Sequence, residues 1–270
     1  MAYPTVDKPY GLQPVNLIGG QVFAGSTRMF PIASGYGTDL FYGDLVKLTV
    51  DGTVIKDTTT SGTSATAGIV GVFLGCEYSQ AGGPIFGKIR KQYWPASTVA
   101  SDAVAYVCDD PDAIFKAAVC NTGTTIAYAG QWVVGKNAGL LQNAGSTATG
   151  DSQVAVGGAA PAATAKIMRI IGTVPETAIS ISATGSTSGS STTVTLASAT
   201  TVYPYMSVSG TGVAAGNYVA SVNSSTEIVL AVAVNLSSIA LTFTGSPEVL
   251  VKFNEGWHSY YNSAGAAVAT

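Results

Sequence analysis

Residues 227–245 read EIVLAVAVNLSSIALTFTG, and this stretch decides the fold. Apolar side chains occupy every second position in two runs, Ile228/Leu230/Val232 and Ile239/Leu241/Phe243. Because successive side chains of a strand point to opposite faces, a period of two predicts strands with one buried and one exposed face. The Asn-Leu-Ser-Ser cluster between the runs is typical of a turn. The stretch therefore predicts two strands joined by a turn.

The same alternation extends over residues 177–246 and marks them as one unit. The earlier alternating runs are Ile179/Ile181, Val194/Leu196, Met206/Val208 and Tyr218/Ala220/Val222. The unit holds a single charged side chain, Glu227, and its runs are separated by clusters of Gly, Ser, Thr and Asn. About six short strands at such spacing predict a small β-sandwich or barrel, which we expect to be a separate domain.

The sequence after this unit resembles in composition the sequence before it. Residues 247–255, PEVLVKFNE, form one apolar strand, which cannot be a domain. We expect this strand to complete a sheet beside the strand at 166–174. Residues 177–246 are then an insertion in a main domain built from 26–176 plus 247–270, which is tolerated where two chain ends meet at a surface turn. The candidate stems are Val174-Pro175-Glu176 and Ser246-Pro247-Glu248.

The main domain is predicted to be a β-barrel or β-sandwich, which makes the whole chain all-β. Residues 68–76, GIVGVFLGC, are apolar at consecutive positions, as in a central strand covered on both faces. Asp51-Gly52 separates two short alternating runs, and this dipeptide between such runs is the strongest local signal for a β-hairpin.

Residues 1–25 are predicted to form an extended N-terminal arm. Pro4, Pro9 and Pro14 and several glycines exclude a helix there. The arm is too apolar for a free tail, so it should lie on a neighbouring subunit or, as the alternative, on its own domain. The candidate partner contacts are Tyr3, Tyr10, Leu12, Val15, Leu17 and Ile18, together with Trp257, Tyr260 and Tyr261 near the C-terminus.

The charge content is low. Charged residues make up 10% of the 270, against roughly 25% in an average soluble domain. Such a surface loses few hydrated ions when it is buried, which favours a protein packed against neighbours. The alternative is a β-protein with a Ser/Thr-rich surface and no such partner. The net charge of −3 is too weak to attract nucleic acid or an anionic membrane.

Candidate groups for catalysis are few. His258 is the single histidine and no GxSxG motif is present, so we expect a surface histidine and no enzyme. The acidic cluster Asp109-Asp110-Pro111-Asp112 is interpreted as a turn after a strand, with a calcium site or a glycosidase pair as alternatives. The cysteines lack metal-ligand spacing, so no metal site, disulfide or cofactor is expected. They are Cys76, Cys108 and Cys120.

The basic cluster Lys88, Arg90 and Lys91 is interpreted as a solvated strand face rather than a phosphate site. The N-terminal sequence has neither the basic nor the apolar region of a signal peptide, and no apolar run is long enough to cross a membrane. We therefore expect synthesis in a cytoplasm, with export only as part of a larger assembly.

Several segments, taken in order, resemble the capsid cement (head decoration) proteins of tailed bacteriophages of the cyanophage and marine-phage type. The segments are KPYGL at 8–12, IVGVFLGCEY at 69–78, QYWPA at 92–96, AYVCDDPD at 105–112 and VLVKFNE at 249–255. Within the insertion, VSGTGVAAG at 208–216 leading to Ile228-Val229-Leu230 is similar to an Ig-like module found in phage virion proteins.

The resemblance implies a structural virion protein on the outer surface of the capsid, assembled in the host cytoplasm. Such a protein would bind the major capsid protein and copies of itself, with a trimer preferred to a dimer, and would cement neighbouring capsomers. The inserted Ig-like domain would project outward, where a host surface glycan is a conceivable ligand. The alternative is a tail or fibre β-protein that adheres to host glycan. A secreted adhesin or glycan hydrolase is disfavoured by the absent signal peptide and the few acids.

Overall fold

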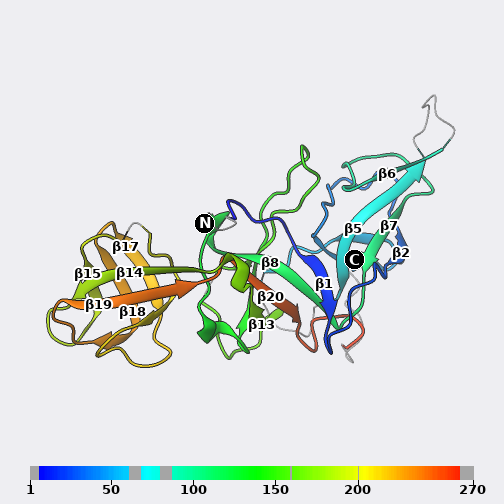
Figure 1. Ribbon diagram of the computed structural model, residues 1–270. Helices are drawn as coiled ribbons and strands as arrows, with labels where there is room; N and C mark the ends of the chain where they lie inside the picture. The colour runs from blue at the N-terminus through cyan, green and yellow to red at the C-terminus, as the bar shows by residue number, and fades with distance from the viewer. Residues whose placement is uncertain (1–5, 61–67, 80–86, 159, 200, 262–270) are drawn as a thin grey trace.

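The computed structural model describes residues 6–60, 68–79, 87–158, 160–199 and 201–261. Strands make up 48% of it and helices 2%, which confirms the all-β prediction. Figure 1 shows three β lobes in a row, each with its own cluster of buried apolar residues. From the right of the figure they are called the far lobe, the middle lobe and the barrel lobe.

The far lobe is an antiparallel sheet with the strand order β2-β7-β5-β3-β4, and β6 pairs with β5. Its strands are β2 (Arg28–Pro31), β3 (Leu45–Leu48), β4 (Val54–Lys56), β5 (Ile69–Ser79), β6 (Lys88–Lys91) and β7 (Val104–Cys108). The hairpin predicted at Asp51-Gly52 is confirmed, since β3 and β4 pair on either side of it. The Gly52 N–H closes the turn by donating to the Thr49 carbonyl at 3.0 Å.

The strand β5 lies between two cores. Val70 and Phe73 belong to the core of the far lobe, whereas Ile69 and Val72 belong to the core of the middle lobe. All four side chains are fully buried. The consecutive apolar residues of this strand are therefore explained by burial on both faces, as the sequence predicted.

The middle lobe is a mixed sheet with the order β10-β13-β20-β8-β12-β11, and β1 and β9 also pair with β8. Its elements are β1 (Gln13–Leu17), β8 (Ala113–Thr122), β9 (Thr125–Ile126), the 3-10 helix η2 (Gln131–Val133), β10 (Asn137–Ala138), β11 (Leu140–Leu141), β12 (Ala155–Gly157), β13 (Met168–Thr173) and β20 (Glu248–Phe253). The last strand, β20, pairs with β13 in the position expected for residues 247–255. Its other neighbour is β8.

The barrel lobe is a single antiparallel sheet with the order β16-β19-β14-β15-β18-β17. Its strands are β14 (Ile179–Ser186), β15 (Ser191–Leu196), β16 (Ser207–Ser209), β17 (Val219–Ser224), β18 (Glu227–Val234) and β19 (Ile239–Gly245). The two ends of this order also meet, because the Val219 N–H donates to the Met206 carbonyl at 2.9 Å and the Val208 N–H to the Asn217 carbonyl at 3.1 Å. The sheet thus curls around one core instead of forming two facing sheets, and the Ig-like relationship stays a prediction.

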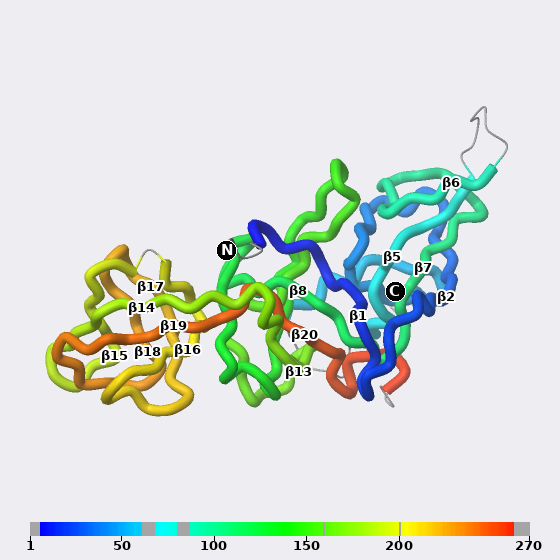
Figure 2. The backbone as a smooth tube through the Cα atoms, in the orientation of Figure 1, coloured from blue at the N-terminus to red at the C-terminus, as the bar shows by residue number. Residues whose placement is uncertain are grey.

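The barrel lobe leaves and re-enters the middle lobe through two neighbouring connections, which run side by side in Figure 2. Its first and last strands pair from Ile179↔Gly245 to Gly185↔Ile239. One connection contains the short 3-10 helix η3 (Pro175–Thr177), and just before it the Val174 N–H donates to the Glu248 carbonyl at 3.1 Å. The ends of the unit therefore lie close together, as an insertion requires.

The N-terminal segment is part of the middle lobe. β1 pairs antiparallel with β8, and Leu12 is fully buried in the middle-lobe core. The Tyr10 hydroxyl donates to the Glu248 carboxylate, which also accepts from Lys116. The expectation that this segment lies on a neighbouring subunit is wrong for these residues, because β1 pairs with β8 and the Leu12 N–H donates to the Gly43 carbonyl of the same chain at 3.0 Å.

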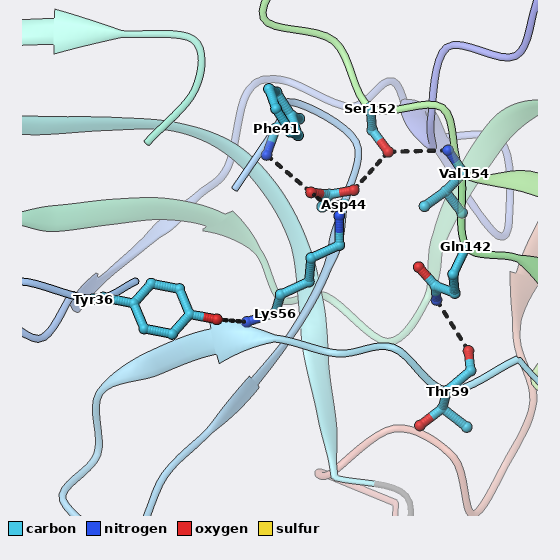
Figure 3. Close-up of polar contacts among 8 residues, drawn as sticks. All are labelled: Tyr36, Phe41, Asp44, Lys56, Thr59, Gln142, Ser152 and Val154. Carbon is cyan, nitrogen blue, oxygen red and sulfur yellow. Dashed lines mark hydrogen bonds and ion pairs between the residues drawn. The ribbon is translucent and has the colours of Figure 1, made fainter. Parts of the chain in front are cut away.

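One buried carboxylate, Asp44, joins the far lobe to the chain that precedes β12 (Figure 3). Its oxygens accept from the Phe41 N–H at 2.9 Å, from Lys56 Nζ at 2.8 Å and from Ser152 Oγ at 2.6 Å. Ser152 Oγ also accepts from the Val154 N–H at 3.1 Å. Asp44 is fully buried, so these donors replace the water that the charge has lost.

Candidate functional site

The predicted partner contacts divide into buried and exposed residues. Leu12 and Trp257 are core residues with 0% and 1% exposure, so the prediction that they contact a partner is wrong. Tyr10 is partly buried on Glu248, Val15 and Leu17 are partly buried in β1, and Tyr3 lies outside the described residues. The exposed members are Ile18 at 47%, Tyr260 at 47% and Tyr261 at 43%.

The structure brings Ile18 and Tyr261 together beside the end of β20, and Tyr260 precedes Tyr261 in the chain. Ile18 and Tyr261 line a groove of about 590 Å³. Its other lining residues are Arg169, Ile171, Lys252, Phe253, Asn254 and Glu255. We call Ile18, Tyr260, Tyr261 and this groove the tyrosine surface. It combines exposed apolar and aromatic groups with three charged side chains, Arg169, Lys252 and Glu255.

The segment that carries the two tyrosines is fixed by backbone hydrogen bonds to both neighbouring lobes. The Asn254 N–H donates to the Ile167 carbonyl at 2.9 Å, and the Ser259 N–H donates to the Ile69 carbonyl at 2.8 Å. The second bond attaches the segment to the first residue of β5. Tyr260 and Tyr261 therefore stand on a defined backbone rather than on a loose tail.

His258 lies beneath the tyrosine surface. The prediction of a surface histidine is wrong, because its side chain is fully buried and its ring packs edge-on against Phe253 at 5.6 Å and Tyr260 at 4.9 Å. Burial lowers the pKa of the imidazole, which favours the neutral form. In that form Nδ1 accepts the Tyr260 N–H at 3.3 Å and helps to orient the tyrosine.

The charges around Tyr260 are paired with one another. Arg28 forms an ion pair with Asp109 at 3.0 Å and lies over the Tyr260 ring at 5.6 Å. The Tyr260 hydroxyl donates to the same Asp109 carboxylate, and burial with this bond raises its pKa to about 12. Tyr260 is therefore a neutral, hydrogen-bonded ring that offers its exposed edge for contact.

The acidic cluster after β7 is the turn predicted from the sequence. The Asp110 carboxylate accepts the Asp112 N–H at 2.8 Å, as in an Asx turn, and Asp112 pairs with Lys252 at 3.2 Å. Within the described ranges, no three His, Cys, Asp or Glu side chains converge as metal ligands.

The three thiols are buried. Burial raises the pKa of Cys76, Cys108 and Cys120 to about 12, so each is a poor nucleophile at neutral pH.

The three tryptophans pack against other side chains of the chain, whereas Tyr260 and Tyr261 stay exposed. Trp94 and Trp257 are buried in two different cores. Trp132 stacks on Tyr218 with 3.7 Å between the ring centroids, and the ammonium group of Lys136 lies 4.3 Å from the Trp132 ring centroid. Two of the three tryptophans are therefore buried, and the third is stacked against Tyr218.

Two members of the basic cluster in β6, Lys88 and Arg90, pair with one neighbouring acid. Glu77 accepts from Arg90 at 2.6 Å and from Lys88 at 3.2 Å, and these bonds lower its pKa to about 2. The Lys88 and Arg90 side chains remain 50% and 78% exposed, as the interpretation of a solvated strand face requires.

Comparison with protein-family models, with curated proteins and with solved structures gave no match. In the part of the chain that the structure describes, neither 3-10 helix approaches the length or apolar character of a membrane-spanning helix.

Proposed function

We propose that this chain is a structural protein of a tailed-phage particle that binds the outside of the assembled head and bridges neighbouring capsomers. The observation that carries the proposal is the tyrosine surface, where Ile18 and Tyr261 line one groove and Tyr260, the residue before Tyr261, is exposed as well. Exposed aromatic and aliphatic groups are the usual anchors of protein interfaces. The capsid is proposed as the partner because several segments, taken in order, resemble cement proteins.

Two further features support the proposal. Only 10% of the residues are charged, so most contacts with a shell would require little ion desolvation. The three lobes lie in a row, as seen in Figure 1, which gives one molecule enough reach to touch more than one neighbour. On a symmetric shell, several weak contacts add through effective concentration.

The test is a binding experiment with purified heads that lack this chain. The wild-type protein is added to expanded heads and to isolated tails, and bound protein is counted by sedimentation and quantitative gel analysis. The proposal expects saturable binding to heads at a fixed ratio to the major capsid protein. Binding to tails alone, or to immobilised host glycan with no binding to heads, would support the tail-fibre alternative instead.

A pair of matched variants locates the contact. Ile18→Asp places a charge in the tyrosine surface and should weaken head binding at least about tenfold, as loss of an interface anchor does. Val99→Asp changes an equally apolar side chain, 68% exposed, in a loop of the far lobe outside this surface. It should leave binding unchanged. Equal affinities of the two variants would show that the tyrosine surface is not the contact.

A further inference from the structure

The barrel lobe contacts the middle lobe through aromatic side chains as well as through its two connections. Tyr128 and Tyr203 lie with their ring centroids 4.4 Å apart, and Trp132 stacks on Tyr218 at 3.7 Å. In both pairs the first residue belongs to the middle lobe and the second to the barrel lobe. This contact is called the joint.

Tyr205 occupies the centre of the joint. It is 4% exposed and lies in the core cluster of the middle lobe, although it stands on the chain just before β16 of the barrel lobe. Its hydroxyl donates to Asn121 Oδ1 at 3.1 Å. Its carbonyl accepts from Trp132 Nε1 at 2.8 Å and from the Gly130 N–H at 2.9 Å.

The backbone of Tyr205 is held in an unfavourable conformation. Its φ of +72° lies in the left-handed region, which is strained for a bulky side chain. Such a conformation persists only where the surroundings determine it, and here the side chain and the carbonyl are both bound by the middle lobe. The strain therefore indicates that docking fixes this residue, rather than the barrel sheet alone.

The two backbones also meet without space for a side chain between them. A Cβ on Gly130 would overlap the backbone nitrogen and the hydroxyl of Ser207 at the start of β16. On the other side, a Cβ on Gly245 would lie 2.9 Å from the carbonyl oxygen of Tyr128. Glycine at both positions permits the close contact.

We infer that the barrel lobe does not swing on its two connections but is held in one orientation by the joint, with Tyr205 as its positioning residue. The inserted unit and the middle lobe then behave as one rigid body. The two candidate stems are then only part of the attachment between the two lobes. The inference stands independently of the proposed head binding, since it concerns only contacts within the chain.

The test measures distances between the barrel lobe and the middle lobe by pulsed electron spin resonance. Spin labels are attached at Ser188→Cys in the barrel lobe and Glu255→Cys, just after β20 of the middle lobe, both exposed positions. The native thiols are buried with raised pKa values, so labelling is confined to the introduced cysteines. The wild-type background should give one narrow distance distribution.

Gly130→Ala should push Ser207 away and broaden the distribution, whereas the control Gly37→Ala should leave it narrow because a Cβ there meets no atom within 4 Å. Should Gly130→Ala fail to fold, Trp132→Ala removes the stack and the bond to Tyr205 from a partly exposed position and should broaden it as well. A broad distribution in the wild type would overturn the inference. A distance distribution in the joint variants that stays as narrow as in the wild type would also overturn it.

Discussion

The buried carboxylate of Asp44 provides a sharp test of how the far lobe is held together. Asp44→Asn keeps the shape of the side chain and removes the charge that accepts from Lys56, Phe41 and Ser152. Removing one partner of a buried ion pair costs about 3–5 kcal/mol, since the other charge is left buried. The Lys56 side chain keeps 12% exposure, which lets its ammonium recover some hydration. We therefore expect the lower end, about 3 kcal/mol.

The assay is scanning calorimetry of the wild type and the variant. For a unit of about 150–250 residues, 1 kcal/mol shifts the melting temperature by about 2–4 °C, so the transition that includes the far lobe should fall by about 6–12 °C. Asp51→Asn at the exposed tip of the β3–β4 hairpin is the control, because Asn-Gly is as compatible with the turn as Asp-Gly. It should change the melting temperature little.

A double-mutant cycle separates the ion pair from the other bonds. Lys56→Met removes the second charge, so the double variant should be more stable than the sum of the single effects by at least about 1 kcal/mol. Strictly additive effects would refute the reasoning, because the cost would then not come from an orphaned charge. A melting temperature of Asp44→Asn equal to that of the Asp51→Asn control would refute it as well.

Three further predictions concern the middle lobe and its tyrosine segment. Leu12→Ala should lower the free energy of unfolding in urea by about 2–5 kcal/mol, while Val22→Ala, at 76% exposure, should have little effect; equal effects would contradict the placement of Leu12 in the core. Gly157→Ala should destabilise the protein in the same assay or prevent folding, because a Cβ there would overlap the Cys120 carbonyl; wild-type stability would show that β12 and β8 lie further apart. The folded-state pKa of His258 lies below its unfolded value of about 6.5, so the unfolded chain binds more protons and stability should fall as pH drops below about 6.5. His258→Gln should flatten that fall between pH 7 and pH 5 in urea titrations, and an unchanged slope would assign it to other groups.

Local patterns in the sequence predict most of the strands. The period-two alternation of residues 227–245 gives β18 and β19, and the Asp51-Gly52 dipeptide gives the β3–β4 hairpin. The doubly apolar stretch at 68–76 gives β5 and its burial on both faces. These features depend on side-chain direction and turn chemistry within a few residues, which a single sequence contains.

Contacts between distant residues could not be predicted in the same way. Leu12 and Ile18 are equally apolar, but Leu12 is buried because β1 pairs with β8, about a hundred residues later in the chain. His258 is buried because its segment attaches to β5. For the same reason, the sequence predicts only part of the tyrosine surface. Aromatic composition indicates candidate contact residues, but it does not show which of them are buried by other parts of the same chain.

The joint left a weak signal in the sequence. Tyr203, Tyr205 and Tyr218 stand in a unit that is otherwise rich in small polar residues, and Trp132 follows a glycine and a glutamine. Aromatic residues near the ends of an inserted unit are compatible with docking, but they do not show which lobe receives them. The left-handed backbone of Tyr205 had no sequence signal, because tertiary contacts impose it.

The position of β20 has a consequence for the order in which a ribosome-bound chain acquires its structure. β8 emerges early, yet its neighbour β20 and the core residues Phe253 and Trp257 emerge only after the whole of 179–245. The inserted sheet closes on itself and can form while the middle lobe is still incomplete. Because its two ends are adjacent, its folding brings β13 and β20 together and shortens the loop that their pairing must close. During synthesis from the N-terminus, folding of the inserted unit would thus assist the folding of the middle lobe.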